Sequence, residues 1–411
     1  MIKSITSVKV ANRRVFVRVG FDVPLKRNIH TEQWEVADDA RIRDALPTLK
    51  HLIESGAKII IGSHLNRPKG WDKDKSLLPA ALKLGEMLSY KVVEVEDSLP
   101  SYPIPHIFFL SSDITTRDYS GLTRAMRNGN ILFLENLRFY PGEQENNPEF
   151  IKILASFADI FANEAFSDAH RKDASVFGLA QNLPAYAGID FLAEIQSLNK
   201  IIRNPKKPMV LLMGGAKISD KVPAIENLAL RADYILVGGE IANTFLKAVG
   251  YEVGKSRVGD IEVAKQLLRN FKEKIVMPVD VVVAKSPDDL PKSASIDKVL
   301  PIEIILDIGP ETIRKFSKFI KSAATLVWNG PFGLIENPKF AYGSRSVAYI
   351  FASRSRGKAF GLVGGGETVE VIDAVDVRQF IDHVSVGGGA MLDFLAGKKL
   401  PAIKALEVTH A

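Results

Sequence analysis

The sequence of 411 residues has no cysteine, three tryptophans and no long uninterrupted apolar run. The absence of cysteine excludes disulfide bonds and thiolate chemistry. No stretch approaches the roughly 18 uncharged apolar residues that a transmembrane helix requires, so we expect no membrane association. The first residues, MIKSITSVKVANRRVFV, lack the apolar core and the small-residue cleavage site of a secretory signal, which predicts a cytoplasmic protein.

The sequence also lacks the features that usually accompany nucleic-acid binding. Its net charge is +6, but lysine and arginine alternate with aspartate and glutamate along most of the chain. No run of five basic residues occurs, and no aromatic residues alternate with basic ones in a stacking pattern. A small anionic substrate accounts for a modest positive excess equally well. We therefore expect small-molecule substrates and no nucleic acid. Nucleic-acid binding stays open as a minor alternative.

Short apolar runs alternate with amphipathic segments of helical period, a pattern typical of parallel sheets covered by helices. The length and the 46% hydrophobic content predict a globular protein with two domains. A polar break, NPKKP at 204–208, places the domain boundary in the apolar-periodic helix before it, at 187–203. The expected strands lie at 15–19, 58–62, 91–95, 131–135 and 159–166 in the first half, and at 209–214, 234–239, 275–283, 325–330 and 359–365 in the second.

The stretch GYEVGKS at 250–256 resembles a phosphate-binding Walker loop but does not have its spacing. That loop needs four residues between its two glycines, and here only the three residues YEV separate them. Val249 occupies the position that would have to be glycine. The stretch alone therefore does not predict nucleotide binding.

Better nucleotide-binding candidates lie where strands of the second half end in glycines. MGGAKISDKV at 213–222 carries two glycines between a strand and a helix, and glycine triplets at 364–366 and 387–389 each follow an apolar run. Glycine allows close backbone approach, and free N–H groups at a helix start suit phosphate oxygens. A tight turn is the alternative for one triplet, and a solvated helix face is the alternative for Lys217 and Lys221. The two triplets together favour a phosphate site, which WNGPFGLIE at 328–336 would complete.

The first half instead concentrates arginine and histidine at strand ends and helix starts. A single arginine or histidine is usually structural or solvated. Several guanidinium groups at one sheet edge would repel one another unless an anion neutralised them, and arginine binds carboxylate and phosphate in a bidentate manner. We therefore expect the first half to bind a small polyanion. The segments concerned are RVGFDVP (18–24), Arg41, SHLNRP (63–68), ENLRF (135–139) and NEAFSDAHR (163–171).

Taken together, these motifs resemble those of the phosphoglycerate kinase family nearly from end to end. RVGFDVP is similar to the family's RVDFNVP and SHLNRP to its SHLGRP, while ENLRF and AHR match it outright. GGAKISDK, LDIGP, WNGPFG, GGGET and SVGGGA are similar to GGAKVSDK, LDxGP, WNGPxG, GGGDT and STGGGA. The resemblance implies an α/β fold of two doubly wound, Rossmann-like parallel-sheet domains, joined by a helix, with a cleft between them.

The resemblance also implies a division of the chain and an activity. A 3-phosphoglycerate-binding domain at 1–186 would be followed by an interdomain helix at 187–203, a nucleotide-binding domain at 204–396, and a tail at 397–411 that returns to the first domain. The activity would be reversible in-line phosphoryl transfer between 1,3-bisphosphoglycerate and ADP, giving 3-phosphoglycerate and ATP in glycolysis and gluconeogenesis. The enzyme would be a hinge-bending monomer that uses Mg²⁺ with ATP or ADP.

The site residues follow from the resemblance, position by position. 3-Phosphoglycerate would be held by Gly20, Phe21, Asp22, Arg41, His64, Leu65, Asn66, Arg67, Arg138, His170 and Arg171. The nucleotide would be held by Gly214, Gly215, Lys217, Lys221, Gly238, Leu306, Asn329, Gly330, Pro331, Glu336, Gly364, Gly365, Gly366, Glu367 and Thr368. Glu367 would also lie near the metal.

The implied reaction needs no general base, because the acceptor is a carboxylate that is already ionised at neutral pH. Catalysis then depends on in-line positioning and on neutralising the transferred phosphoryl group. We expect Arg41 and Lys221 to act through their side chains, and Gly365 and Gly388 through backbone N–H groups. Ligands on separate domains could react only after the domains close, and closure would also exclude water.

The chain departs from the family motifs at several positions. Gly20 replaces an aspartate and Asp22 an asparagine, and Asp22 would supply the missing carboxylate if the strand continued that far. Glu367 stands where many members have aspartate, Asn66 where they have glycine, and Val386 where they have threonine. Two alternatives therefore stay open: an inactive or repurposed relative that keeps the fold for binding or regulation, and a kinase of another acyl phosphate or polyanionic acid.

Overall fold

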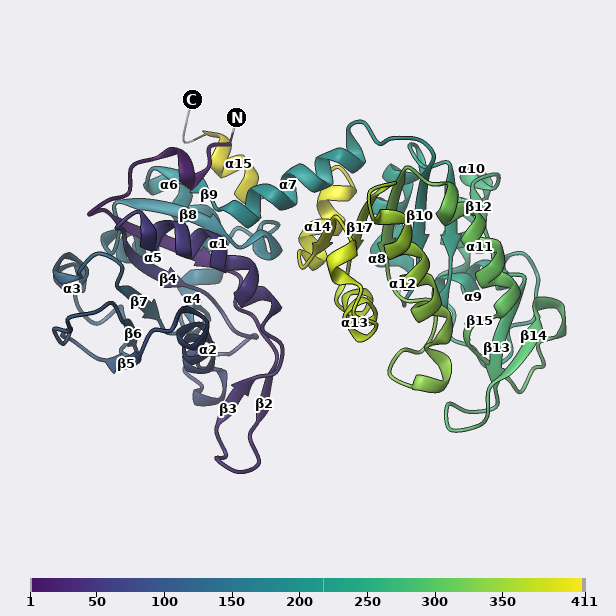
Figure 1. Ribbon diagram of the computed structural model, residues 1–411, viewed down its shortest axis with the longest axis horizontal. Helices are drawn as coiled ribbons and strands as arrows, with labels where there is room; N and C mark the ends of the chain where they lie inside the picture. Colours follow the sequence, from purple (N-terminus) through teal and green to yellow (C-terminus); the bar gives the residue numbers. More distant parts are fainter. Residues whose placement is uncertain (1, 217, 409–411) are drawn as a thin grey trace. The chain divides into compact units, whose positions relative to one another are not determined.

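The computed structural model describes residues 2–216 and 218–408, and the chain divides into two compact units (Figure 1). Unit 1 comprises Met1–Ile195 with Lys399–Ala411, and unit 2 comprises Gln196–Lys398. The division falls within helix α7 (Ile189–Ile202). Among the described residues, no helix combines the length and the apolar character needed to span a membrane.

Unit 1 is built on a seven-stranded parallel sheet with the order β5-β6-β7-β4-β1-β8-β9. Its strands are β5 (Val92–Val95), β6 (Ile107–Leu110), β7 (Ile131–Leu134), β4 (Lys58–Gly62), β1 (Arg14–Val19), β8 (Ile160–Glu164) and β9 (Ala185–Ala187). Alternate residues of a strand face opposite sides, so Val15, Val17 and Val19 point to one face. There they pack against α1 (Ala40–Glu54) and α2 (Leu78–Leu88).

Helix α1 forms because its apolar residues recur at helical spacing. Ile42, Ala45, Leu49 and Leu52 are all buried against the sheet, three or four positions apart. Each fully buried leucine or isoleucine contributes about 1.5–3 kcal/mol relative to exposure. This packing fixes the first turn of α1, and with it Arg41, near the carboxyl ends of the strands.

Unit 2 has a six-stranded parallel sheet with the order β12-β11-β10-β16-β17-β18. Its strands are β12 (Ile275–Val276), β11 (Tyr234–Val237), β10 (Met209–Met213), β16 (Thr325–Asn329), β17 (Phe360–Gly364) and β18 (His383–Ser385). One face, including Leu212 and Trp328, packs against α11 (Pro310–Ser322), α12 (Tyr342–Ser355) and α13 (Gly366–Ala374). The remaining helices are α8 (Ile218–Ala229), α9 (Gly239–Ala248), α10 (Ile261–Phe271) and α14 (Gly388–Leu395). Two helix-covered parallel sheets confirm the predicted fold class.

The predicted strand at 275–283 is wrong. The segment forms β12 and then β13 (Asp280–Ala284), and these belong to different sheets. Pro278 lies between them, and proline has no N–H group to donate to a sheet ladder. Strand β13 pairs antiparallel with β14 (Lys292–Ser295) and β15 (Ile304–Ile308), which the sequence pattern did not reveal. The pattern also missed β6, β9, β18 and the hairpin of β2 (Leu25–Arg27) with β3 (Trp34–Val36).

The C-terminal helix α15 (Pro401–Val408) packs within unit 1, although it follows the last helix of unit 2 (Figure 1). It contacts α6 (Leu179–Asn182) and β9. The Ala402 N–H donates to the Ala169 carbonyl oxygen at 3.1 Å. The start of α15 therefore contacts the segment that carries Arg171.

A group of carboxyl side chains gathers where α7 begins. Glu164 accepts hydrogen bonds from the Thr48 hydroxyl at 2.6 Å and from the N–H groups of Asp190 and Phe191, both at 3.1 Å. These bonds satisfy N–H groups that a helix start leaves free. Burial raises the pKa of Glu164 to about 7. Burial, together with Asp44, Glu164 and Glu194, raises the pKa of Asp190 to about 9.

We predict that Asp190→Asn stabilises the protein at pH 8. A carboxyl whose pKa is raised on folding binds its proton more tightly in the native state, so stability falls as pH rises from about 4 to about 9. Asparagine stays neutral throughout, and we expect the melting temperature at pH 8 to rise by roughly 3 °C or more. Thermal unfolding followed by circular dichroism at pH 4 and pH 8 measures this.

The pH dependence is the decisive part of that measurement. At pH 4 the variant should melt close to the wild-type temperature. The control is Asp393→Asn, because the Asp393 carboxylate forms a solvent-accessible ion pair with Lys398 at 2.6 Å. An equal change in melting temperature for Asp190→Asn at both pH values would contradict the raised pKa of Asp190.

Candidate functional site

The candidate residues of unit 1 lie at one edge of its sheet. Strands β7, β4, β1 and β8 are neighbours, and each is followed directly by a segment with candidate residues, at 135–139, 63–67, 20–22 and 165–171. The carboxyl ends of parallel strands meet at the same sheet edge, where such folds bind ligands. We call the group of Arg18, Arg41, His64, Arg138 and Arg171 the cationic site.

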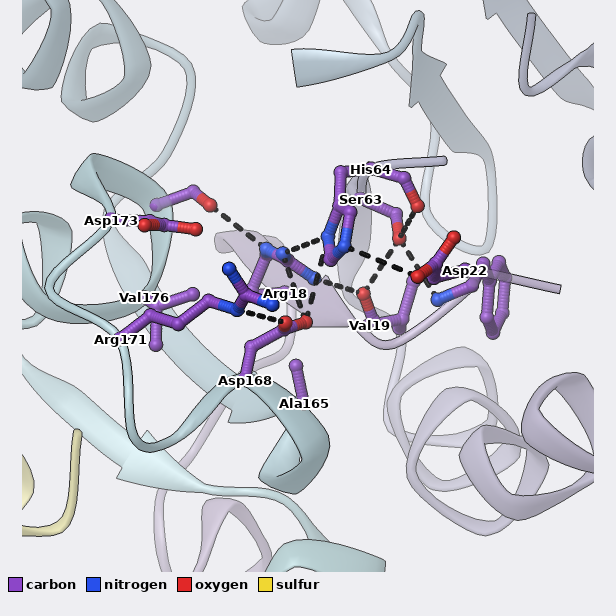
Figure 2. Close-up of polar contacts among 12 residues, drawn as sticks. Arg18, Val19, Asp22, Ser63, His64, Ala165, Asp168, Arg171, Asp173 and Val176 are labelled. Carbon is purple, nitrogen blue, oxygen red and sulfur yellow. Dashed lines mark hydrogen bonds and ion pairs between the residues drawn. The ribbon is translucent and has the colours of Figure 1, made fainter. Parts of the chain in front are cut away.

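Arg18 and His64 form the centre of the cationic site (Figure 2). The Arg18 guanidinium is fully buried, and its Nη2 lies 2.8 Å from His64 Nδ1 and 3.2 Å from Asp168 Oδ2. A guanidinium can only donate, so His64 Nδ1 must accept and the ring proton must be on Nε2. Burial lowers the pKa of His64, and Arg18 and Arg138 lower it further. His64 is therefore a neutral hydrogen-bond donor through Nε2.

Asp22 lies on the Nε2 side of His64, at 3.7 Å between Oδ2 and Nε2 (Figure 2). Its Oδ1 accepts from the Asn66 N–H at 2.8 Å, and its carbonyl oxygen accepts from Arg41 Nη1 at 2.8 Å. Burial opposes ionisation, but the contacts with His64, the Asn66 N–H and Arg41 hold the pKa of Asp22 well below its usual range. Asp22 is thus an ionised acceptor within a cationic site.

Strand β1 ends at Val19, so the condition on which Asp22 would share its face, a strand that continues to Asp22, is not met. Instead the chain turns, and the Phe21 N–H donates to the Ser63 hydroxyl at 2.9 Å. This turn carries Asp22 toward His64. A Cβ at Gly20 would lie 3.0 Å from Ser167 Oγ, so a side chain there would need that serine to shift.

Arg138 and Arg171 extend the cationic site on the side of Asp168 and Asp173. Arg138 Nη1 donates to the Asn66 carbonyl oxygen at 2.8 Å, and Arg171 Nε lies 3.3 Å from Asp168 Oδ1. Burial lowers the pKa of Arg138, and the neighbouring Arg171 adds to the effect. Arg138 Nε is buried and has no hydrogen-bond partner among residues 2–216 and 218–408. Unsatisfied guanidinium donors are what an anion-binding site presents.

The structure thus links Arg41, His64, Asn66, Arg138 and Arg171 through contacts with one another or with Asp22 and Asp168. Asn66 has φ 57°, a left-handed conformation that asparagine tolerates better than most residues. Arg67 is exposed and makes no ion pair within the described part of the chain. Phe21 and Leu65 are buried in the core of unit 1, and His170 is partly buried beside Arg171.

The candidate residues of unit 2 also follow adjacent strands, β11, β10, β16 and β17. The loops after these strands are joined backbone to backbone: the Gly214 N–H donates to the Asn329 carbonyl at 2.9 Å and the Gly215 N–H to the Pro331 carbonyl at 2.6 Å. A Cβ at Gly214 would collide with the Pro331 carbonyl, and one at Gly238 would collide with Phe332. Glycine is required here by close approach of neighbouring loops.

Asn329 and Thr368 use their side chains to hold these loops. Asn329 Nδ2 donates to the Gly364 carbonyl at 2.8 Å, and the Gly330 N–H donates to Thr368 Oγ1 at 2.6 Å. Both side chains are buried. They therefore fix the position of the Gly364–Gly366 segment.

A cation and a carboxylate face Gly215. A Cβ there would lie 3.3 Å from Lys221 Nζ and 3.4 Å from Glu367 Oε2, and Lys221 Nζ donates to the Gly214 carbonyl at 2.6 Å. Helix α13 begins beside them at Gly366, after Gly365 with φ 94°, and α14 begins at Gly388. Helix starts of this kind present free N–H groups to an anion. Lys217 lies outside the described residues.

A cavity of about 430 Å³ opens at this edge of the unit 2 sheet. Five of the candidate residues line it: Gly215, Leu306, Pro331, Glu336 and Glu367. Its lining combines charged residues such as Lys255, Glu336 and Glu367 with apolar ones such as Leu306, Leu334 and Ile335. A concave site lined by apolar side chains and a few charged groups suits a nucleotide, which has an apolar base and anionic phosphates.

The GYEVGKS stretch forms a wall of this cavity. It follows helix α9, and Gly254 forms an antiparallel bridge with Ile304 of β15. The Lys255 N–H donates to the Glu303 carbonyl at 2.8 Å, and the Lys255 side chain lines the cavity. The stretch is therefore attached to a strand and does not wrap around an anion as a Walker loop does.

The sequence analysis did not assign several residues that the structure brings to these sites. Arg18 and Asp168 were within quoted motifs, and the only signal for Asp168 was its place two residues before His170. Glu143 and Ser175 lie outside those motifs. Arg257 lines the unit 2 cavity beside Lys255, but nothing in its sequence neighbourhood pointed to a ligand.

Comparisons with known proteins show the family of the chain. The model of the family described as phosphoglycerate kinase matches residues 5–398. Phosphoglycerate kinase of Dictyoglomus turgidum is 41% identical over 96% of this chain and 96% of its own length, and that of Desulfosudis oleivorans is 40% identical over 99% of each. The solved phosphoglycerate kinase structure from Coxiella burnetii has a TM-score of 0.82 at 36% identity, covering 99% of each chain. The structure from Pyrococcus horikoshii has a TM-score of 0.83 at 30% identity, covering 100% of this chain and 99% of that one. The chain belongs to the phosphoglycerate kinase family, and hence to a family of kinases.

Proposed function

We propose that this protein transfers a phosphoryl group reversibly between 1,3-bisphosphoglycerate and ADP, with unit 1 binding the acid and unit 2 the nucleotide. The observation that carries the proposal is the cationic site, where the buried Arg138 Nε has no hydrogen-bond partner in the part of the chain that the structure describes and His64 is a neutral donor. Family membership supports the identity of the substrates. A coupled spectrophotometric assay with 3-phosphoglycerate and MgATP tests it directly.

The acid would be held by groups of complementary chemistry. Arg138 and Arg171 would bind the phosphate or the carboxylate in a bidentate manner, because guanidinium groups suit both anions and the buried Arg138 Nε has no hydrogen-bond partner among the described residues. His64 would add a neutral N–H donor from Nε2. The ionised Asp22 cannot bind an anion, but it can accept the proton of a hydroxyl group. The ligand is therefore expected to carry a hydroxyl beside its anionic groups, as 3-phosphoglycerate does.

Phosphoryl transfer would need positive charge and positioning only, since the acceptor carboxylate is already ionised. Lys221 would neutralise charge on the transferred group, and the starts of α13 and α14 would offer the N–H groups of Gly365 and Gly388 or their neighbours. Arg41 would do the same from the acid side. Leu306 and Glu336, which line the cavity, would contact the base and the ribose.

Mg²⁺ fits the residues present. Magnesium is commonly held by one or two carboxylates together with substrate phosphates and water. Glu367 supplies one carboxylate to the lining of the cavity. Its Oε2 would lie 3.4 Å from a Cβ at Gly215, so it is close to the backbone of the loop after β10. We propose that Glu367 holds the ion with the nucleotide phosphates, where it would supply further positive charge. A monomer in the cytoplasm, without a nucleic-acid partner, stays our prediction from the sequence.

Replacing Arg41 should affect turnover far more than nucleotide binding. We expect Arg41→Ala to lower kcat by about 10³-fold, the lower end of what an arginine contributes in phosphoryl transfer. The KM for ATP should change by less than about threefold, because Arg41 belongs to unit 1. Steady-state kinetics measure both. The control is Arg43→Ala on the same helix, which removes only an ion pair with Asp39, and near-wild-type turnover of Arg41→Ala would reject the role.

Replacing Lys221 should slow transfer without weakening the binding of the acid. We expect Lys221→Ala to reduce the single-turnover rate by at least about 100-fold, because a positive charge next to the transferred group is lost. Calorimetry with 3-phosphoglycerate alone should give an unchanged Kd. A matched control is Lys265→Ala, whose ammonium forms an exposed ion pair with Glu262. Loss of acid binding in Lys221→Ala would argue against this division of roles.

A pair of ligands tests whether Asp22 recognises the substrate hydroxyl. We expect Asp22→Ala to raise the KM for 3-phosphoglycerate about 10-fold, because a hydrogen bond to a charged acceptor is lost. With 3-phosphooxypropanoate, which lacks the hydroxyl, wild type and variant should differ little. Comparable losses with both ligands would mean that Asp22 only shapes the site. A panel of other phosphorylated carboxylic acids then shows whether Gly20 and Asp22 admit a different acceptor.

A further inference from the structure

A buried carboxyl group is connected to the cationic site through Ser175. Glu143 of α4 (Pro141–Gln144) is fully buried. Its Oε1 accepts from the Ser175 hydroxyl at 2.5 Å, and its Oε2 accepts from the Ser175 N–H at 3.0 Å. Ser175 belongs to a π-helical turn, Ala174–Gly178, and is also fully buried.

Ser175 connects Glu143 to Arg18. Its hydroxyl oxygen accepts from Arg18 Nε at 2.8 Å while its single hydrogen is donated to Glu143. Arginine can only donate, so Ser175 Oγ accepts from Arg18 Nε, and the one hydroxyl hydrogen is donated to Glu143 when that carboxyl is ionised. Burial raises the pKa of Glu143 to about 7. Arg18 in turn donates from Nη2 to His64 Nδ1 at 2.8 Å and from Nη1 to the Val19 carbonyl. A hydrogen-bond chain therefore runs from Glu143 through Ser175 and Arg18 to His64.

We propose that Glu143 and Ser175 are positioning residues that set the tautomer of His64. They hold the Arg18 guanidinium in one plane, so that its Nη2–H occupies His64 Nδ1 and the ring proton remains on Nε2. The inference rests on the proposed function only for the identity of the acid. Neither residue contacts the acid itself.

The tautomer matters because the two ring nitrogens face different surroundings. Nδ1 faces Arg18 and Asp168, while Nε2 faces Asp22, at 3.7 Å. With its proton on Nε2, His64 offers a donor to an anion bound there. With its proton on Nδ1, the Nδ1–H of His64 would point at the N–H of Arg18 Nη2, so that two donors would face each other. Nε2 would then present only a lone pair to the anion, which repels it. The chain from Glu143 excludes the second state by keeping an Arg18 donor on Nδ1.

Two substitutions break the chain at different points. Glu143→Gln keeps the shape of the side chain but replaces one acceptor by an N–H₂ donor, so it cannot accept both bonds from Ser175. Ser175→Ala removes the hydroxyl that holds Arg18 Nε. Neither substitution replaces Arg18, His64 or Asp22. The matched control is Glu164→Gln, because Glu164 is also buried in unit 1, with its pKa raised to about 7 by burial, but bonds to Thr48 and the start of α7.

The test uses long-range ¹H–¹⁵N NMR of the histidine side chains of the whole protein, with the His64 signal assigned from its absence in His64→Gln. In the wild type we expect a neutral ring protonated at Nε2. In Glu143→Gln and Ser175→Ala we expect a mixture of tautomers, and a Kd for 3-phosphoglycerate about 10-fold weaker by calorimetry. The Kd for ADP should not change. In Glu164→Gln the tautomer and both Kd values should match the wild type.

Either of two results overturns the inference. One is a wild-type ring protonated at Nδ1, which needs no variant to observe. The other is a variant pair that loses thermal stability but keeps the Nε2 tautomer and the wild-type Kd for the acid, which would make the chain merely structural. Because the tautomer is read without substrate, a wild type that fails to bind 3-phosphoglycerate would contradict the proposed function while leaving this test intact.

Discussion

The fully buried guanidinium of Arg18 is the constraint on which the acid site depends. A buried cation is tolerated only when its donors are paired, and here they reach Ser175, the Val19 carbonyl, His64 and Asp168. These partners come from β1 itself and from the segments after β4 and β8, so satisfying one side chain aligns several strand ends. The same bonds fix the ring of His64 and leave its Nε2 toward Asp22. The binding groups are therefore ordered before any ligand arrives, which reduces the entropy lost on binding.

The carboxylates of the acid site are placed in a way that the family motif does not suggest. The chain has glycine at position 20, and Ser167 Oγ lies 3.0 Å from where a Cβ would be. Asp22 and Asp168 instead place carboxylates on opposite sides of His64, at 3.7 Å from Nε2 and 3.5 Å from Nδ1. The buried Asp168 carboxylate contacts Arg18, His64 and Arg171. Asp22 is partly exposed and can therefore reach a ligand. Asp168 thus holds the cations, whereas in the proposed function Asp22 would face the substrate.

Periodicity and motif order could predict the parallel strands and the segments that carry the sites, because both are local in sequence. Strands such as β4 at 58–62 and β10 at 209–213 follow directly from apolar runs bounded by polar residues or glycine. Pro278 was a local signal that the segment 275–283 is interrupted, but the pattern could not reveal which sheet each part joins, since sheet membership is decided by partners far along the chain. It also could not pair Arg18 with Asp168 or Ser175, which are about 150 residues away, because an arginine inside a strand reads as an ordinary strand residue. Contacts between segments that meet only at the edge of the folded sheet cannot be predicted from local sequence patterns.

The two sites differ in how they would tolerate sequence change. In unit 2 the loops are held by backbone bonds between Gly214, Gly215, Asn329 and Pro331, and the groups offered to phosphate are N–H groups at the starts of α13 and α14. A backbone N–H is present whatever the side chain, so Val386 in place of threonine leaves those donors intact. Glu367 keeps the charge of the aspartate that it replaces. In unit 1 recognition depends on side-chain atoms whose partners are individually fixed, so a change at position 20 or 22 alters the groups that meet the ligand. The proposed acid site is for this reason the place where this chain would differ in specificity from its relatives, while glycine geometry constrains the proposed nucleotide site.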